Sequence, residues 1–390
     1  MSVREKSIGL FLDGEPKGGG TFQYNLSMLK ALVSLDAREF RVIIYFRDKG
    51  WASEVPVHLE SVYISERFYV RYIRFLLSKV DRSRKLLQLT SKYFDTSVRA
   101  LNSSGCDVVI FPSQDAISYE VDVESLSTVH DLMHRYEPDF DEYKGQEYIN
   151  RENHYRAMCR KVSGVLVDSN LGKKHVCDSY NIDPNRVFVL PFVPPSYIFK
   201  GDHVDVFRKY NLPKQYVFYP AQFWEHKNHV NLLLAIRILK DEYKYLITLV
   251  LVGSKKNYFD TVVNTISKLE IEAEVKILGY VDNADIVALY RNALVTTFVS
   301  LIGPTNIPPM EALALGSPLV CSNAYAMPEQ VGDGGILVDP KSPVEIASAI
   351  YKIASDEPFR QGLIRKGYDV IGRYGQADFD KTLLKIINSF

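Results

Sequence analysis

The sequence of 390 residues is poor in cysteine, in excess charge and in long apolar runs. Its four cysteines stand far apart, which excludes a close zinc-binding pair and a dense disulfide framework and favours free thiols in a reducing compartment. Basic and acidic side chains balance at 47 each, so no overall field favours a nucleic acid as partner. The N-terminus has only a short apolar stretch before Asp13, too short for a secretory signal or a membrane span, and we expect a cytoplasmic protein.

The composition and the apolar pattern predict an α/β protein of two domains. Hydrophobic residues make up 46% and charged residues 24%, and the length suits two domains of about 150 to 200 residues each. Short apolar runs alternate with amphipathic helical stretches, which is typical of parallel sheets covered on both faces. The predicted strands are 7–13, 40–46, 107–112, 126–131, 164–169 and 186–191 in the first half, and 216–220, 246–253, 275–280, 294–300, 317–322 and 335–340 in the second.

The stretch 191–213 divides these two halves. It carries four prolines and little periodicity, which predicts a linker. We therefore expect an N-terminal Rossmann-like domain over 1–195 and a C-terminal one over 196–374. The remaining residues, 375–390, predict a last helix that packs back on the N-terminal domain.

Ligands of open parallel sheets bind at the carboxyl ends of the strands, so we expect the functional residues in the loops there. The loop 13–21 holds three consecutive glycines before a helix, which favours a phosphate or sugar contact; the alternative is a mobile connector. Its spacing is neither GxGxxG nor a Walker loop, and Arg47 and Asp48 end the second strand without a clear ribose-binding acid. These absences argue against a nicotinamide-dependent dehydrogenase.

Two further strand ends carry candidate residues. His130 follows a predicted strand, where a neutral imidazole can hydrogen-bond a sugar hydroxyl or a phosphate oxygen; a structural histidine is the alternative, and Asp131 can equally cap the next segment. Lys227 lies between a strand and a helix, so its ammonium and the N–H groups at the helix start are predicted to converge on a diphosphate. The alternative is a solvated lysine beside a capping Asn228.

The stretch 303–318, GPTNIPPMEALALGSP, carries one charged side chain, Glu311. Asn306 is a suitable N-cap and the two prolines after it suit a first helical turn. The stiff helix start favours a phosphate, and Glu311 is placed to accept hydrogen bonds from a ribose diol. An ordinary glutamate near a helix start is the alternative.

These motifs, with GGGTFQYNLSMLKAL, TVHDLMHRYEP, VDSNLGKKHVCDSYNI, VLVGS and VKILGYV, resemble the retaining glycosyltransferases of family four along nearly the whole chain. The resemblance implies the GT-B fold, two Rossmann-like domains facing across a cleft. It implies transfer of a hexose such as mannose or rhamnose from a nucleotide sugar to a glycan or lipid-linked acceptor, without cofactor or essential metal. Bacterial surface polysaccharide or O-antigen synthesis is the expected context.

The resemblance also assigns roles to individual residues. Glu311 matches the second glutamate of the Glu, seven residues, Glu motif, which holds the donor ribose, and Lys227 matches a lysine on the donor diphosphate. His130 matches a histidine at the reaction centre. The expected catalytic residues are therefore His130 and Lys227, and the expected donor-binding residues are Gly19, Gly20, Gln222, Lys227, Asn228, Gly303, Thr305, Asn306, Ile307 and Glu311.

Two positions depart from the family pattern. Gly303 stands where the first motif glutamate is expected, so the usual carboxylate on the transferred sugar is missing; Thr305 and Asn306 are candidates to replace it. Gln222 stands where an arginine often pairs with the lysine, which lowers the positive charge around the diphosphate.

The expected mechanism is electrostatic. Lys227 and the helix starts stabilise the departing diphosphate, whose oxygen takes the acceptor proton, so no enzymic base is required. Closure of the domains about 191–213 is expected to exclude water and to bring His130 toward the donor.

A basic, aromatic segment at 66–92 suggests an anionic membrane surface as a further partner and a peripheral location on its inner face. A helix packed on the N-terminal sheet with a solvated basic face explains the same pattern. The remaining functional alternatives are a GT-B epimerase or phosphorylase and a non-catalytic sugar-binding protein.

Overall fold

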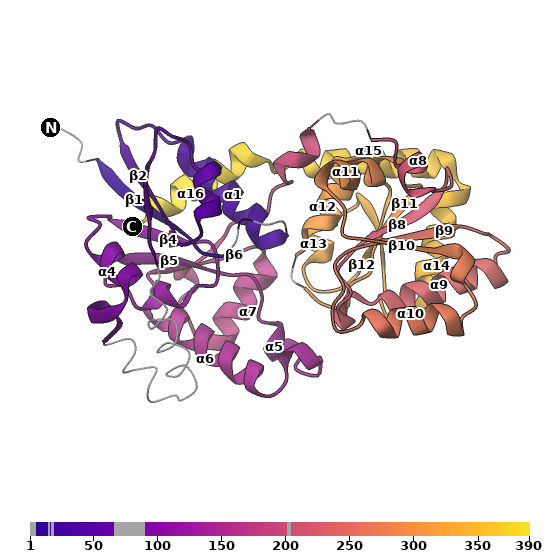
Figure 1. Ribbon diagram of the computed structural model, residues 1–390, viewed down its shortest axis with the longest axis horizontal. Coiled ribbons are helices and arrows are strands. Elements are labelled where there is room, and N and C mark those ends of the chain that lie inside the picture. The colour runs from indigo at the N-terminus through magenta and orange to yellow at the C-terminus, as the bar shows by residue number, and fades with distance from the viewer. Residues whose placement is uncertain (1–4, 15, 17–18, 66–89, 201–203, 304) are drawn as a thin grey trace. The chain divides into compact units, whose positions relative to one another are not determined.

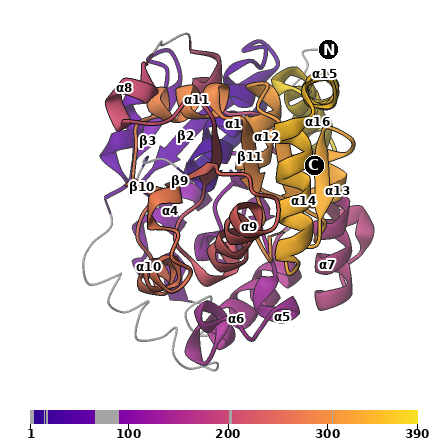
Figure 2. The same cartoon turned by 90° about the vertical axis from the view of Figure 1, so that its right-hand side faces the viewer.

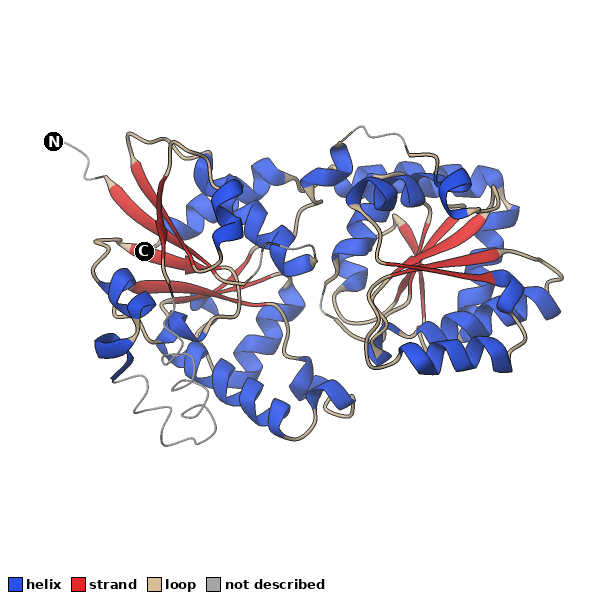
Figure 3. Ribbon diagram, viewed as in Figure 1, coloured by secondary structure: helices blue, strands red, loops and turns tan. Residues whose placement is uncertain are grey.

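The computed structural model describes residues 5–14, 16, 19–65, 90–200, 204–303 and 305–390. The chain forms two compact units, one of Met1–Phe192 with Gln376–Phe390 and one of Val193–Gly375. Each unit contains one sheet whose paired strands all run parallel, flanked by helices (Figures 1 and 3). The expected α/β architecture of two doubly wound domains is confirmed.

The sheet of the first unit has seven strands in the order β3-β2-β1-β4-β5-β6-β7. Every residue of β4 and β6 is buried, because helices cover both faces of the sheet and the apolar runs have no solvent side. The strands are β1 (Lys6–Leu12), β2 (Phe40–Phe46), β3 (Glu60–Tyr63), β4 (Val108–Phe111), β5 (Glu124–Val129), β6 (Gly164–Val167) and β7 (Val187–Val189).

The helices of the first unit are α1 (Gly20–Val33), α4 (Thr96–Asn102), α5 (Met133–Tyr136), α6 (Gln146–Lys161), α7 (Asn170–Tyr180) and α16 (Gln376–Ile387). The last of them, α16, packs against α1 (Figure 1). The Gln376 amide donates to the Ser27 carbonyl at 3.1 Å, and Phe379 is fully buried with its ring 5.9 Å from that of Tyr24. The C-terminal end of the chain thereby completes the core of the first unit.

The sheet of the second unit has six strands in the order β10-β9-β8-β11-β12-β13. They are β8 (Tyr216–Pro220), β9 (Thr248–Val252), β10 (Val275–Gly279), β11 (Val295–Phe298), β12 (Leu319–Ser322) and β13 (Gly335–Val338). The helices are α8 (Val206–Tyr210), α9 (His229–Asp241), α10 (Phe259–Lys268), α11 (Asn283–Asn292), α12 (Ile307–Ala314), α13 (Met327–Val331), α14 (Pro343–Ser355) and α15 (Glu357–Ile371). The contacting pair α9 and α14 lies side by side in Figure 2.

Each sheet has one point where the strand order reverses. In the first sheet it lies between β1 and β4, and in the second between β8 and β11, because the chain moves outward in opposite directions from these neighbours. The loops at their carboxyl ends diverge, which leaves a crevice where ligands of such sheets bind. The fold therefore points to four loops, those after β1, β4, β8 and β11.

The predicted linker 191–213 is shorter than expected. Residues from Val193 onward belong to the second unit, and Ile198 and Val206 are buried in its core. Asn211 ends α8 in the left-handed conformation, which asparagine tolerates. The prolines obscured two short helical segments, η5 (Ser196–Phe199) and α8, that pack into the second unit.

The packing of α16 can be tested through the tryptophans Trp51 and Trp224, one in each unit. In a Trp224→Phe background, Phe379→Ala should lower the free energy of unfolding reported by Trp51 fluorescence in urea by about 3 to 5 kcal/mol, because it leaves a cavity beside α1. Phe199→Ala, at a side chain 68% exposed, is the control and should change it by less than about 0.5 kcal/mol. A loss of less than about 1 kcal/mol for Phe379→Ala would show that α16 is not part of this core.

Candidate active site

The loops after β8 and β11 are tied together at the switch point of the second sheet. The Leu301 N–H donates to the His226 carbonyl at 2.8 Å, and the Ser300 hydroxyl donates to the same oxygen at 3.1 Å. The short helix η6 (Glu225–Lys227) ends the loop after β8 and places Lys227 at the crevice. The two loops are thus held together by one main-chain and one side-chain hydrogen bond to the same carbonyl.

Lys227, at the end of the loop after β8, contacts Asn306, which follows β11 on the other side of the crevice. Its half-buried side chain donates from Nζ to Asn306 Oδ1 at 3.2 Å, and Nζ lies 5.1 Å from the centroid of the Phe298 ring. The ring face attracts the ammonium and the amide oxygen orients it. Since Asn306 is neutral, this contact fixes the ammonium without cancelling its charge.

Asn306 stands at the start of α12, but its side chain does not cap the helix as predicted. Its oxygen accepts from Lys227, and its main chain is held by the Gln330 amide, which accepts from Asn306 N at 3.1 Å and donates to Asn306 O at 2.7 Å. Asn306 Nδ2 is buried with no hydrogen-bond partner among the residues that the structure describes. This orphaned donor lies beside the lysine at the switch point.

The helix start itself supplies few donors. The first N–H groups of a helix have no intrahelical partner, but Pro308 and Pro309 have no N–H. Of the first three residues of α12, only Ile307 carries one. The ammonium of Lys227 is therefore the main positive group at this point.

Gly303 has a backbone that disfavours a side chain. Its φ is +120°, and a Cβ atom there would lie 2.9 Å from Asn306 Nδ2. The glutamate that family members are expected to have at this position would strain the loop and displace the amide of Asn306. A glycine at position 303 therefore leaves the space that the Asn306 side chain needs.

Glu311 is buried and already has partners. It is 6% exposed; Tyr290 donates to Oε2 at 2.6 Å and Tyr197 donates to Oε1. Burial raises the pKa of this carboxyl, and the two tyrosine hydroxyls oppose the shift. No pattern in the sequence indicated either tyrosine, because they lie on η5 and α11, away from the stretch that carries Glu311.

Several predicted donor-binding residues have local roles. Asn228 is buried and donates to the carbonyls of Val299 and Pro340, which ties strand ends together, while the Gln222 amide oxygen accepts from Trp224 Nε1 at 3.0 Å. Thr305 is half-buried and Ile307 is buried. The structure thus brings Lys227, Gly303 and Asn306 together at the switch point.

In the first unit, His130 lies at the end of β5. Its Nε2–H donates to the Pro112 carbonyl at 3.0 Å, and its ring stands edge-on to Tyr24 at 5.3 Å. Burial lowers the pKa of His130, which favours a neutral ring with Nδ1 left as an acceptor. The predicted glycines are exposed at the start of α1, where Gly19 has a φ of +109°.

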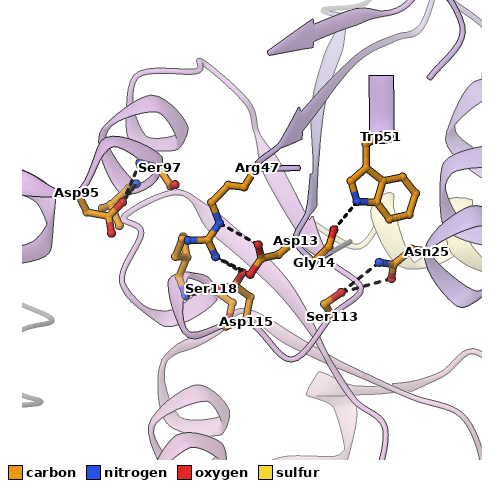
Figure 4. A network of polar contacts seen from close by, with 12 residues as sticks. Asp13, Gly14, Asn25, Arg47, Trp51, Asp95, Ser97, Ser113, Asp115 and Ser118 are labelled. Atoms are coloured by element: carbon orange, nitrogen blue, oxygen red, sulfur yellow. Dashed lines mark hydrogen bonds and ion pairs between the residues drawn. The ribbon is translucent and has the colours of Figure 1, made fainter. Parts of the chain in front are cut away.

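The first sheet also carries a charged cluster that the sequence reasoning missed (Figure 4). Arg47, after β2, donates to both oxygens of Asp13, after β1, at 3.0 and 2.5 Å. It also donates to Asp115, after β4, at 3.1 Å. Burial raises the pKa of Asp115 to about 7, opposed by Arg47 and reinforced by the charge of Asp13. Burial also acts to raise the pKa of Asp13, but the charge of Arg47 and the hydrogen bonds with Arg47, Asp115 and the Gly14 main chain together lower it, and the net shift is downward.

Other expectations remain untested. The segment 66–89, which carries most of the predicted membrane-facing charge, lies outside the described residues. No helix in the described part of the chain is long and apolar enough to cross a membrane. Within the same residues no group of three His, Cys, Asp or Glu side chains is arranged to hold a metal ion, and metal independence stays a prediction.

The second unit contains the part of the chain that matches a family model. Residues 205–370 match the family Glycosyl transferases group 1. The chain is 25% identical over 270 residues to O-antigen chain mannosyltransferase B of Escherichia coli, covering 68% of this chain and 70% of that protein. It is 24% identical over 347 residues to O-antigen chain mannosyltransferase RfbU of Salmonella typhimurium, covering 86% and 87%.

A solved structure is similar in fold over almost the whole chain. Anabaena Alr3699/HepE in complex with UDP-glucose has a TM-score of 0.72 at 17% identity, and the match covers 98% of this chain and 100% of that one. The expected GT-B fold is confirmed by this likeness.

The raised pKa of Asp115 predicts that the free energy of unfolding depends on pH. Its folded pKa of about 7 lies above the ordinary value of 3.8, so the folded protein retains a proton that the unfolded chain loses on going from pH 4 to 7. The resulting stabilisation is present at low pH and is lost as the pH rises through this window. The free energy of unfolding of the wild type minus that of Asp115→Asn should therefore fall between pH 5 and 7, by at most about 1.4 kcal/mol per unit.

Urea unfolding at each pH measures this difference, and the subtraction removes the opposite contribution of the buried histidines. Asp183→Asn, which also removes a carboxylate that caps a 3₁₀ turn but at an exposed site, is the control. A difference for Asp115→Asn that rises with pH would contradict the inferred proton on Asp115.

Proposed function

We propose that the chain transfers mannose from a nucleotide sugar to a glycan or lipid-linked acceptor in surface polysaccharide synthesis, with retention of configuration. The match of residues 205–370 to the family Glycosyl transferases group 1 supports a glycosyl transfer. The two relatives named above support mannose, since both are named O-antigen chain mannosyltransferases. The Anabaena protein bound to UDP-glucose supports a nucleotide sugar as donor.

The observation that carries this proposal is the Lys227 contact with Asn306 at the β8/β11 switch point. When the bond between the sugar and the diphosphate breaks, negative charge accumulates on the departing phosphate oxygens. A fixed ammonium lowers the free energy of that state more than that of the ground state. Lys227 stabilises the leaving diphosphate, and Asn306 positions Lys227.

The acceptor hydroxyl loses its proton to an oxygen of the departing diphosphate, so a dedicated base is not required. His130 is a hydrogen-bonding group in this scheme rather than a base, because its lowered pKa keeps it neutral and Nε2–H is committed to Pro112. Its role at the transferred sugar stays a proposal carried by the resemblance.

Glu311 binds the donor ribose in this scheme, but a ribose hydroxyl must first displace a tyrosine hydroxyl from the carboxylate. Both of its oxygens accept from tyrosine hydroxyls, and Tyr197 lies on the short η5 segment. A ribose hydroxyl can donate to Oε1 in place of the Tyr197 hydroxyl. Tyr197 therefore competes with the nucleotide for the carboxylate.

Substitution of Lys227 tests the donor site. Lys227→Met should lower kcat for nucleoside diphosphate release from the donor by roughly 10² to 10³-fold, because it removes the main positive charge at the leaving group. The assay follows release of GDP from GDP-mannose and of UDP from UDP-glucose, with mannose-terminated oligosaccharide as acceptor.

Lys255→Met is the matched control, since Lys255 is exposed and lies after β9 rather than at the switch point. Retention of activity within a few-fold in Lys227→Met would count against the proposed leaving-group role. Formation of free mannose without an extended acceptor would favour a different activity on the same fold.

Removal of the Tyr197 hydroxyl tests the exchange at Glu311. Tyr197→Phe should tighten binding of GDP by roughly tenfold, because the ribose no longer displaces a hydrogen bond to a charged group. Binding of 2′,3′-dideoxy-GDP, which lacks the diol, should not tighten. Isothermal titration calorimetry measures both, with Tyr210→Phe as control because Tyr210 donates to Asp285 elsewhere in the unit. Equal changes for the two nucleotides would rule out ribose binding by Glu311.

A further inference from the structure

The carboxylate of Asp131 follows His130 directly in the chain, but its hydrogen bonds go to other groups. Asp131 Oδ1 accepts from the Met133 N–H at the start of α5, at 3.0 Å, and from Arg151 Nη2 of α6, at 2.5 Å. The His130 ring donates from Nε2 to the Pro112 carbonyl. The mechanism derived above uses neither Asp131 nor Arg151, although Asp131 lies at the same strand end as His130.

Arg151 is held by two aromatic rings as well as by this carboxylate. The carbon of its guanidinium lies 5.2 Å from the centroid of the Tyr143 ring and 5.6 Å from that of Tyr155. Burial acts to lower the pKa of Arg151, but the two tyrosines and the carboxylate outweigh it and the net shift is upward. A guanidinium packed against aromatic rings binds a carboxylate in a fixed geometry, so the ion pair between Arg151 and Asp131 is a rigid one.

The ring of His130 is packed mainly against other aromatic rings. Tyr24 of α1 stands edge-on to it at 5.3 Å, and Phe192 is stacked on it at 6.0 Å. Burial lowers the pKa of His130, and the negative charge of Asp131 acts in the opposite direction. The position and the charge of the Asp131 carboxylate therefore decide how readily the ring takes up a proton.

The groups around Asp131 differ in charge. Burial, reinforced by the charge of Arg151, lowers the pKa of His134 to about 4, so this second histidine is neutral near pH 7. Burial raises the pKa of Tyr143 and of Tyr155, which keeps both hydroxyls neutral as well. Among these described neighbours of Asp131, Arg151 is the one that carries positive charge.

We propose that Arg151 is a positioning residue for the transfer: it holds the Asp131 carboxylate away from the His130 ring and offsets its charge, so that the ring stays neutral with Nδ1 as a hydrogen-bond acceptor. A neutral ring suits its place, because the transferred sugar becomes positively charged as its bond to the diphosphate breaks, and an imidazolium beside it would oppose that charge. The inference rests on the proposed function, which places His130 at the transferred sugar.

Loss of Arg151 has a defined consequence. The carboxylate of Asp131 loses the cation that offsets it and one of the two hydrogen bonds that orient it, and the bond from the Met133 N–H remains. An unpaired carboxylate next to an imidazole favours the protonated ring. Arg151→Met should therefore raise the pH at which His130 becomes protonated.

NMR titration of the full chain with ¹⁵N-labelled histidine measures this pH. The protein has eight histidines, and the spectrum of His130→Gln identifies the His130 signals. The midpoint of the His130 titration in Arg151→Met should lie at least about 0.5 pH units above that of the wild type. An unchanged midpoint would overturn the proposal.

Arg156→Met is the matched control, because Arg156 lies on the same helix and pairs at 2.7 Å with a different carboxylate, that of Glu152. It should leave the His130 midpoint within about 0.2 pH units of the wild type. Arg151→Lys keeps the positive charge and should restore most of the wild-type midpoint. An equal rise in Arg156→Met would show a general change of field and contradict the specific role of Arg151.

A double variant tests whether Arg151 acts through Asp131. Arg151→Met with Asp131→Asn removes both the guanidinium and the carboxylate, so the midpoint should return to or below that of the wild type. Asp131→Asn alone, which keeps Arg151, should lower the midpoint and provides the same test if the double variant does not fold. A midpoint that stays raised without the carboxylate would contradict the proposed route.

The pH profile of kcat links this charge to the reaction. With GDP-mannose and the mannose-terminated oligosaccharide, the acidic limb of kcat in Arg151→Met should move upward by the same amount as the His130 midpoint, while KM for GDP-mannose changes less than about twofold. A kcat lowered equally at every pH would indicate a merely structural role and overturn the proposal. Absence of GDP-mannose turnover in the wild type would sink the proposed function, whereas a His130 midpoint that Arg151→Met does not move would sink this inference even in an active enzyme.

Discussion

The hydrogen bond between the Lys227 ammonium and the Asn306 amide is the interaction on which the account of the second unit depends. It joins the loop after β8 to the start of α12, where the order of the described strands in this sheet reverses. Three features support it. Gln330 fixes the main chain of Asn306, the carbonyl of His226 fixes the two loops, and Gly303 leaves room for the Asn306 side chain.

The same interaction explains why a helix start that is poor in donors can serve a diphosphate. Pro308 and Pro309 stiffen the first turn of α12 but remove two N–H groups. Charge stabilisation is thereby concentrated on one side chain, which has a neutral partner. The family pattern, with a glutamate at the position of Gly303, would place a carboxylate close to that charge. In this chain the side-chain amide of Asn306 lies beside Gly303 instead, and its Nδ2 has no hydrogen-bond partner among the described residues.

The sequence predicted the architecture well because the buried strands are continuous apolar runs and the helices carry apolar faces. It missed β3, an edge strand that pairs only with β2 and whose four residues are largely exposed. It also extended the linker too far, since prolines mark breaks in regular structure without showing whether the chain still packs. The position of Lys227 between a strand and a helix was predictable from local order alone.

The partners of the predicted residues were not predictable in this way. Asparagine is a favourable capping residue, but the Asn306 side chain accepts a hydrogen bond from a lysine 79 positions earlier instead. Glu311 is held by tyrosines from two other elements, and the Asp13, Arg47 and Asp115 cluster is assembled from the loops after three separate strands. Periodicity and spacing describe one segment at a time, whereas these contacts follow from the order of strands in the sheet.

The most direct test of the central claim is hydrogen–deuterium exchange of the full chain with and without GDP. A diphosphate held at the β8/β11 switch point should slow exchange in peptides that cover 222–229 and 303–312, and leave the loops at the amino ends of the same strands unchanged. Protection confined to other loops, with these two segments unaffected by saturating nucleotide, would contradict the placement of the donor site.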